Sequence, residues 1–307
     1  MPNRSSILVS MKRLMTEKRA LILRCFTEGL GINATARMAD VSKNTVLKLL
    51  ADLGPVCRDF QAFTLVNLHS KKIQVDEIWA FTGMKQKNVP AELAGTWGLG
   101  DCWTWVAIDA DTRLVPAWVV GPRDGETAEL FMRMLARRIA NRIQLTSDGH
   151  KPYLEAVESA FGSEIDYAQL IKIFSLPEGS TQTERKYSPG ECCGTRREVV
   201  SGDPDMRHVA TSYSERLNLE IRCKNRRLTR LTNGFSRKVE NLEHSMDVGF
   251  MVYNFVKPHG SLRVSPAMAA GVTDHLWGYE EVIGLLEASE ESAVDVAERR
   301  HDRKRAD

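Results

Sequence analysis

Three acidic residues, far apart in the sequence, stand where a carboxylate could bind a metal ion. Asp76 interrupts the apolar stretch IQVDEIWAF, Asp148 directly follows the stretch RIQLTS, and Glu215 lies near the start of a long basic segment. A charge inside a buried strand costs roughly several kcal/mol unless it is paired or binds a metal. Because Asp148 precedes Gly149, a simple turn is the alternative interpretation of that pair.

These residue types suit the cutting and joining of phosphodiesters. Mg²⁺ prefers hard oxygen ligands and keeps several waters, and two such ions roughly 4 Å apart can activate an attacking hydroxyl and stabilise the leaving oxygen. Three carboxylates suffice, because water and phosphate supply the remaining ligands. We therefore expect Asp76, Asp148 and Glu215 to be both metal ligands and catalytic residues, with Mg²⁺ as the cofactor and Mn²⁺ as its alternative.

Three other acids compete for these roles. Glu220 lies five residues beyond Glu215, on a different face of the expected helix. Glu77 should point to the opposite face of the sheet from Asp76, because side chains alternate along a strand. Asp109 fits a hairpin turn.

Two further groups could take part. His150 could orient a phosphate or assist Asp148, although a polar residue at a helix start is an equal alternative. Cys192 and Cys193 could bind zinc together with His208, but adjacent ligands are an unusual zinc spacing.

The spacing of apolar residues predicts the strands and helices that would position the three acids. From residue 71 onward the predicted order is three strands, a helix, a strand, a helix and a further strand, followed by helices. That order suits an α/β fold of the ribonuclease H-like type, with a mixed sheet and flanking helices. The expected strands are 71–83, 101–108, 114–121, 141–149 and 164–174, and the expected helices between them are 125–141 and 150–162.

The N-terminal region has the pattern of a small all-α DNA-binding domain. Residues 17–51 predict three short helices, the last of which begins at Ser42, a good helix cap. Helix, tight turn and helix form a helix-turn-helix pattern, although any small helical bundle is an alternative. Residues 1–50 hold nine Lys or Arg against three acids, which favours DNA as the partner. The residues expected to contact DNA are Lys43, Asn44, Thr45 and Lys48.

A second basic segment surrounds Glu215. Residues 213–238 hold eight Lys or Arg against two acids, in a chain whose net charge is only +2. A single long helix would carry Glu215 in its first turn and a stripe of arginines, spaced four apart, in its later turns. We expect the stripe to contact DNA phosphates, with ion pairs to nearby acids as the alternative. The stripe consists of Arg222, Arg226 and Arg230.

The cysteines and the apolar runs of the sequence indicate the setting in which the protein works. Six cysteines without a CxxC pair indicate a reducing, cytoplasmic setting. The chain has no apolar run near the ~20 residues that a membrane span needs, and no secretory signal is recognisable.

The predicted domain organisation has five parts. They are a helix-turn-helix region at 1–52, a linker at 53–70, a ribonuclease H-like catalytic domain at 71–262 with a long loop at 175–208, a C-terminal extension at 263–286 and a disordered tail at 287–307.

The stretches VDEIWAF, TSDGHKPY and SYSERLNLEIR, followed by NRRLTRLTNGFSRKVENLEHSM, resemble the catalytic core of bacterial insertion-sequence transposases of the DDE class, most closely the insertion-sequence-one type. The likeness covers about residues 70–262 and ends in YNFVKPHGSLRVSPAMAAG. It implies a transposase that cuts transposon-end DNA and joins its 3′-hydroxyl to target DNA, as a homo-oligomer on double-stranded DNA in the bacterial nucleoid. By position it assigns Asp76, Asp148 and Glu215 as the metal-binding triad. The cysteine-rich zinc module that members often carry at the N-terminus is missing here.

Two other functions stay open at this point. One is a helix-turn-helix DNA-binding regulator whose transposase-like domain is inactive, and the other is a ribonuclease H-like nuclease without strand transfer. An intact triad argues against the first function. A DNA-binding N-terminal region and a basic helix that carries the third acid argue against the second.

Overall fold

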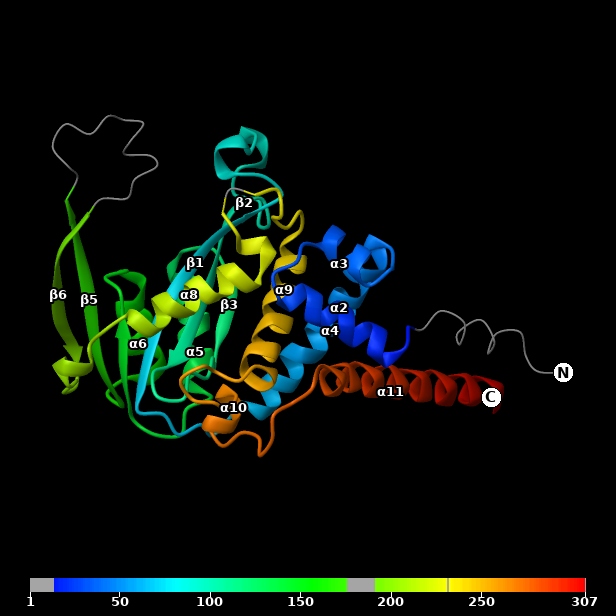
Figure 1. The fold of residues 1–307 in the computed structure, drawn as a ribbon. Helices are drawn as coiled ribbons and strands as arrows, with labels where there is room; N and C mark the ends of the chain where they lie inside the picture. The colour runs from blue at the N-terminus through cyan, green and yellow to red at the C-terminus, as the bar shows by residue number, and fades with distance from the viewer. Residues whose placement is uncertain (1–13, 176–190, 231, 307) are drawn as a thin grey trace. The chain divides into compact units, whose positions relative to one another are not determined.

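The computed structural model describes residues 14–175, 191–230 and 232–306. Residues 1–13 of the predicted helix-turn-helix region and 176–190 of the predicted long loop lie outside these ranges. The chain divides into two compact units, an α/β unit and a helical unit (Figure 1). The α/β unit consists of Leu65–Glu220 and Ala269–Val272, and the helical unit of Met1–Thr64, Ile221–Met268 and Thr273–Asp307.

Six strands form one mixed sheet in the α/β unit, in the order β3-β2-β1-β4-β5-β6. β1 pairs antiparallel with β2 and parallel with β4, whereas β5 pairs parallel with β4 and antiparallel with β6. β1 and β4 are therefore central, and the two ends of the sheet are antiparallel. The strands are β1 (Lys72–Thr82), β2 (Gly100–Asp109), β3 (Trp118–Gly121), β4 (Ile143–Ser147), β5 (Ile165–Ser175) and β6 (Glu191–Ser201).

Two helices cover one face of this sheet, α5 (Gly125–Ala136) and α6 (Pro152–Phe161) (Figure 1). The side chain of Asp124 caps α5 by accepting a hydrogen bond from the backbone N–H of Thr127 at 2.9 Å. Every second residue of β1 faces these helices, as the pleat requires. The main core of the unit lies here and includes Ile73, Val75, Trp105, Phe131, Leu135, Tyr153 and Val157.

The opposite face of the sheet carries α8 (Ser212–Lys224). Gln74 of β1 is buried, and its Oε1 accepts the backbone N–H groups of Tyr213 and Ser214 at 2.9 and 3.1 Å. Two of the N–H groups that a helix start leaves unpaired are thus satisfied from the sheet. Leu217, which is also buried, anchors the next turn, so α8 is fixed over β1.

The α/β class, the mixed sheet and its flanking helices were all predicted, and the structure confirms them. One strand was not predicted, because β6 falls in the segment 175–208 that was expected to be a loop. Both faces of β6 are largely exposed, so its sequence ECCGTRREVVS lacks the apolar alternation that marks a half-buried strand. Backbone pairing with β5 is what makes it a strand.

Long helices make up the helical unit, and α4 packs along α9. A Cβ atom on Gly54 of α4 would come within 2.6 Å of the Cβ atom of His244, so the close approach of the two helices requires glycine. Gln61 is buried in the same interface and donates to the backbone oxygen of Asp247 at 3.2 Å. The main helices of the unit are α2 (Thr16–Thr27), α3 (Ile32–Met38), α4 (Lys43–Thr64), α9 (Val239–Met251) and α11 (Tyr279–Ala306).

The segment 53–70, expected to be a linker with some helix, is helical as far as Thr64, because α4 continues to that residue. Leu53, Cys57 and Gln61 are all buried. This spacing of four is a helical core stripe that continues past the point where the polar sequence suggested an end. The compact helical unit also reaches beyond the expected region 1–52, since it includes α9 and α11.

The predicted disordered tail at 287–307 is wrong, because α11 includes this segment as far as Ala306. The first part of the segment is held by α2. Thr16 donates to Glu287 at 2.9 Å, and Arg19 donates to both carboxylate oxygens of Glu290 at 3.1 and 3.2 Å. Within the described part of the chain, no helix combines the length and the apolar character of a membrane span.

The predicted arginine stripe does not form. Helix α8 ends at Lys224, and Asn225 adopts an extended conformation with φ −115° and ψ 104°. The buried amide of Asn225 donates to the Ser245 hydroxyl at 3.1 Å and accepts from the backbone N–H of Arg227. These bonds compete with helical pairing, so Arg222, Arg226 and Arg230 do not lie on one helix.

Candidate metal centre

Asp76 lies in the middle of β1, on the face that α8 covers. β1 and β4 pair only as far as Gln74 and Thr146, so Asp76 stands just beyond the point where the two strands part. Its Oδ1 accepts the backbone N–H of Glu77 at 2.8 Å, and its Oδ2 accepts the amide of Asn218 in α8 at 2.8 Å. Asp76 is therefore a largely buried carboxylate at the edge of an opening in the sheet.

Asp148 follows the last residue of β4 at the same opening. Continuing the β1–β4 register by two residues beyond Gln74 and Thr146 sets Asp148 beside Asp76. The Oδ1 atom of Asp148 accepts the backbone N–H of His150 at 2.9 Å, which is the local bond of an Asp turn. The turn interpretation of this residue is thus confirmed, and the turn leaves its second carboxylate oxygen facing the opening.

Glu215 lies in the first turn of α8. Its Oε1 accepts from the Thr211 hydroxyl and from the Lys172 ammonium group of β5, each at 2.5 Å. Because Gln74 of β1 fixes the start of this helix, the position of Glu215 depends on the strand that carries Asp76.

The three acids predicted from the sequence line one cavity of about 480 Å³. They reach it from different elements: a central strand, the turn after its neighbour and a helix on one face. The competitor Glu220 is not among the lining residues. The residues that line the cavity are Asp76, Arg123, Asp148, Gly149, His150, Ile171, Lys172, Thr211 and Glu215.

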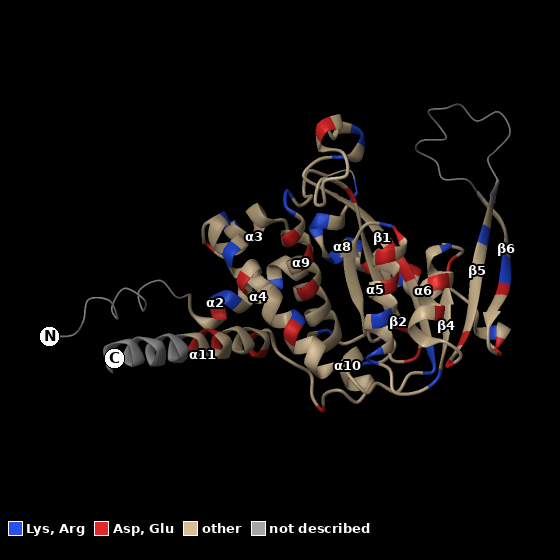
Figure 2. Ribbon diagram, turned by 180° about the vertical axis from the view of Figure 1, so that it is seen from behind, with Lys and Arg blue, Asp and Glu red and all other residues tan. Residues whose placement is uncertain are grey.

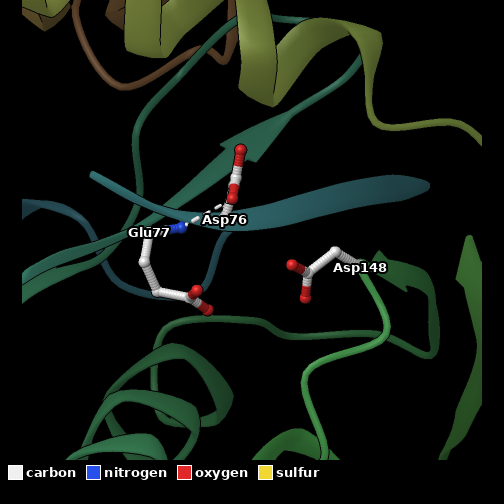
Figure 3. Close-up of side chains that lie close together, drawn as sticks. All are labelled: Asp76, Glu77 and Asp148. Carbon is white, nitrogen blue, oxygen red and sulfur yellow. Dashed lines mark hydrogen bonds between the residues drawn. The ribbon is translucent and has the colours of Figure 1, made fainter. Parts of the chain in front are cut away.

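Glu77 is a fourth acid that the sequence analysis set aside. Ligand atoms of Asp76, Glu77 and Asp148 all lie within 4.8 Å of one another. Figure 3 shows the Asp76 and Glu77 side chains leaving β1 in opposite directions, as predicted, with the Asp148 carboxylate facing that of Glu77. Glu77 comes close to Asp148 although it leaves β1 on the face opposite to Asp76. This is possible because β4 ends before Asp148, so no strand lies between the two carboxylates. In the sequence, the two consecutive acids of VDEIW were the signal that could have drawn attention to Glu77.

A cation balances part of this charge. Arg123 donates to Oε2 of Glu77 from Nε at 3.1 Å and lies 3.0 Å from it through Nη2, and the same Nη2 is 3.7 Å from Oδ2 of Asp148. The Glu77 side chain is 1% exposed, and it also receives a hydrogen bond from the buried Tyr153 hydroxyl. A carboxylate buried this deeply needs such partners, because burying an unpaired charge is costly.

The electrostatic environment raises the pKa values of two acids. Burial raises the pKa of Asp76 to about 6, and the nearby charges of Asp148 and Glu215 add to the rise. Burial likewise raises the pKa of Glu77 to about 7, while a hydrogen bond from Tyr153 and the Arg123 charge oppose the rise and the Asp148 charge adds to it. Burial alone would also raise the pKa of Glu215, but hydrogen bonds from Lys172 and Thr211 outweigh it and hold that pKa below its ordinary value.

This set of donors fits a hard divalent cation. The donors are carboxylate oxygens gathered from several elements, and burial, together with the crowding of negative charge, raises the pKa values of Asp76 and Glu77. Mg²⁺ and Mn²⁺ prefer such oxygen ligands. Asp76, Asp148 and Glu215 could hold such ions from the cavity, with Glu77 adjoining from the other face of the sheet.

The remaining candidates lie elsewhere. Asp109 forms the expected turn, since its Oδ1 accepts the backbone N–H groups of Asp111 and Thr112. Cys192 and Cys193 are exposed near the start of β6. His208 follows the other end of that strand, where it lies 3.7 Å from Asp205. This separation removes the geometric basis for the zinc hypothesis.

The residues expected to contact DNA from the helical unit lie at the start of α4. Lys43 and Asn44 are exposed. Thr45 is half-buried, and its backbone N–H and hydroxyl both contact the side chain of the capping Ser42. Lys48 is exposed but forms an ion pair with Asp52 at 2.5 Å.

Comparisons with known proteins add no identification. No protein-family model matches the sequence, and no curated protein matches it significantly. The function has to be argued from the cavity, its acids and the sequence motifs that carry them.

Proposed function

We propose that this chain is a DDE-class transposase, most like the insertion-sequence-one type, which cuts transposon-end DNA and joins the freed 3′-hydroxyl to target DNA. One observation carries the proposal: Asp76, Asp148 and Glu215, which the sequence motifs single out, line the same cavity. Residues so far apart in the chain meet there only through the tertiary fold.

The arrangement of elements supports the same proposal. A ribonuclease H-like fold would have a central strand with the first acid, a parallel neighbour that ends at the second acid, and a helix after the fifth strand that carries the third. β1, β4 and α8 fit this order, with β6 as an addition at the edge of the sheet.

The roles of the residues follow from their contacts. Bound Mg²⁺ or Mn²⁺ would activate the attacking oxygen and stabilise the leaving oxygen of a phosphodiester. Asp76, Asp148 and Glu215 would hold these ions. Asn218 fixes the orientation of Asp76 through a hydrogen bond of 2.8 Å. Gln74 fixes the start of the helix that carries Glu215.

Two surfaces suit double-stranded DNA as the partner. Figure 2 shows basic residues on both β5 and β6, and the strand register places Lys172 of β5 and Arg197 of β6 on the same face of the sheet. In the helical unit, α3 and α4 would form the helix-turn-helix, with Ser42 as the cap and Lys43 exposed at the start of the second helix. A homo-oligomer on DNA, in the cytoplasm and at the nucleoid, completes the proposal.

The test is a Mg²⁺-dependent cleavage and strand-transfer assay on the DNA that flanks the gene. The parent protein should cut and join, and Asp148→Asn should reduce both steps by at least about a hundredfold, because it removes a metal ligand. Asp101→Asn is the matched control, since Asp101 is exposed on β2 and is not among the residues of the cavity. DNA binding without cleavage would favour an inactive regulator, and cleavage without joining would favour a nuclease.

A further inference from the structure

Two cationic side chains line the cavity, and they are held in different ways. Arg123 makes two contacts with Glu77, at 3.1 and 3.0 Å, and its guanidinium lies over the Trp103 ring at 4.8 Å from the ring centre. A planar guanidinium bound to a buried carboxylate and stacked on an aromatic ring is fixed in place. Arg123 is therefore a permanent part of the site.

Lys172 is held by one acid. Its Nζ lies 2.5 Å from Oε1 of Glu215, and the two side chains are 34% and 45% exposed. An ion pair exposed to this extent is weak, worth at most about fivefold in an equilibrium constant. The ammonium group of lysine is also a mobile point charge on a flexible stem, so this pair can be exchanged at little cost.

Resting on the proposed function, we propose that Lys172 is an exchangeable internal counterion. It neutralises Glu215 when no divalent cation is bound, gives up that carboxylate when the cation binds, and then contacts a phosphate of the bound DNA.

Competition for a single oxygen atom is the basis of this exchange. The Oε1 atom of Glu215 already accepts from Lys172 and from Thr211, so a metal ion that takes this oxygen must displace a donor. Repulsion between the metal and the ammonium group favours the displacement of Lys172 over that of the neutral Thr211 hydroxyl. The released ammonium group of Lys172 then lies in a cavity that a phosphate of the DNA would enter. Lysine ammonium groups bind phosphate readily.

The exchange predicts that metal and DNA bind cooperatively. Without DNA, Lys172 should weaken metal binding, because it competes for Glu215. With DNA, the displaced ammonium group finds a new partner, so each ligand should strengthen the binding of the other, as linkage requires.

The first experiment measures Mn²⁺ binding by calorimetry in the absence of DNA. Lys172→Gln should bind Mn²⁺ about two to five times more tightly than the parent, since the competing ion pair is gone, and Lys172→Arg should resemble the parent. Lys151→Gln is the charge-matched control, because Lys151 is exposed beside the cavity residue His150 and forms no ion pair with any described residue. Equal or weaker Mn²⁺ binding by Lys172→Gln than by Lys151→Gln overturns the proposal.

The second experiment measures the affinity for a short DNA duplex by fluorescence anisotropy, with and without Mn²⁺. The parent should gain affinity when Mn²⁺ is added. In Lys172→Gln this gain should fall at least about threefold, and the salt dependence with metal present should flatten by roughly one unit, as expected when one phosphate is no longer neutralised. An unchanged gain in Lys172→Gln overturns the transfer of Lys172 to DNA.

The two experiments separate this proposal from the proposed function. If the parent binds no Mn²⁺ at millimolar concentrations, the metal site itself is wrong and both proposals fail. If the parent binds Mn²⁺ and Lys172→Gln binds it no more tightly, only the counterion role fails. Thermal unfolding of each variant, compared with the parent, checks that the exposed substitution leaves the fold intact.

Discussion

Asp76 is a carboxylate in an environment that disfavours its charge. Burial and the charges of Asp148 and Glu215 raise its pKa to about 6, so at neutral pH the metal-free protein holds an ionised group whose burial lowers the stability of the fold. Such a residue is expected at a functional site rather than in a fold selected for stability alone. The cost of this buried charge should be measurable as a change in the free energy of unfolding.

Asp76→Asn should stabilise the metal-free protein near neutral pH by about 1–2 kcal/mol. The new amide can keep its neighbours, because Asn218 has an amide oxygen without a hydrogen-bond partner that could accept from it after rotation. The carboxylic acid contributes stability below its unfolded pKa near 4 and loses that contribution as pH rises through about 6. The advantage of the variant should therefore vanish near pH 4. Urea unfolding in a chelator at both pH values measures this, and a destabilised variant at neutral pH would contradict it.

Metal affinity should depend steeply on pH, because the ligands must lose protons before they bind. The pKa values of Asp76 and Glu77 are raised to about 6 and about 7. Mn²⁺ binding should accordingly weaken as pH falls from about 7, by up to about tenfold per unit for each proton displaced. Calorimetry over this range checks the slope. A pH-independent affinity would mean that neither acid binds the metal.

At the level of elements, β1 sets the position of α8. The buried amide oxygen of Gln74 takes the place of a helix cap by accepting two backbone N–H groups of α8. The helix that carries Glu215 is thus tied to the strand that carries Asp76, two residues beyond Gln74. This coupling aligns two acids that the sequence separates widely.

Gln74→Ala should destabilise the protein by about 1–3 kcal/mol, since it leaves two N–H groups at the buried start of a helix without an acceptor. It should also weaken Mn²⁺ binding, although Gln74 is not a ligand, because Glu215 loses its fixed position. Gln74→Glu keeps an acceptor and should restore most of the stability. Chemical unfolding and calorimetry on the three proteins test this. If Gln74→Ala binds Mn²⁺ as the parent does, Gln74 does not position Glu215.

At the level of the whole molecule, the chain contains an α/β unit with the acids and a helical unit with an exposed basic helix start. Each unit has its own core, which suits a division between chemistry and DNA binding. In the helical unit, Lys43 is the better candidate for a DNA contact than Lys48, because Lys48 is already paired with Asp52.

Replacing Lys43 and Lys48 by Ala should weaken DNA binding and flatten its salt dependence by roughly one unit for each phosphate that is no longer neutralised. Most of the effect should come from Lys43. A control that replaces Lys71 and Lys87, two exposed lysines of the α/β unit, removes the same charge elsewhere. Binding curves at several salt concentrations measure the effect. Equal losses of affinity in both double variants would point to general charge rather than to the start of α4.

The sequence by itself determined strands β1 to β5, because their apolar residues repeat with the period of a pleated sheet facing a core. It also singled out Asp76, since an acid in the apolar stretch IQVDEIWAF stands out against its neighbours. It could not find β6, whose exposed residues carry no such pattern. Nor did its local patterns reveal the end of α8, because the side-chain bonds of Asn225 that stop it reach Ser245, a residue of a different helix.

Only the tertiary structure decided which acids share a cavity. Strand pairing fixes the distance between Asp76 and Asp148, and that pairing depends on hydrogen bonds between segments far apart in the chain. The same pairing ends before Asp148, which lets Glu77 approach from the other face of the sheet. Residue type and local periodicity act over a few neighbours, whereas a metal site is a property of distances across the fold.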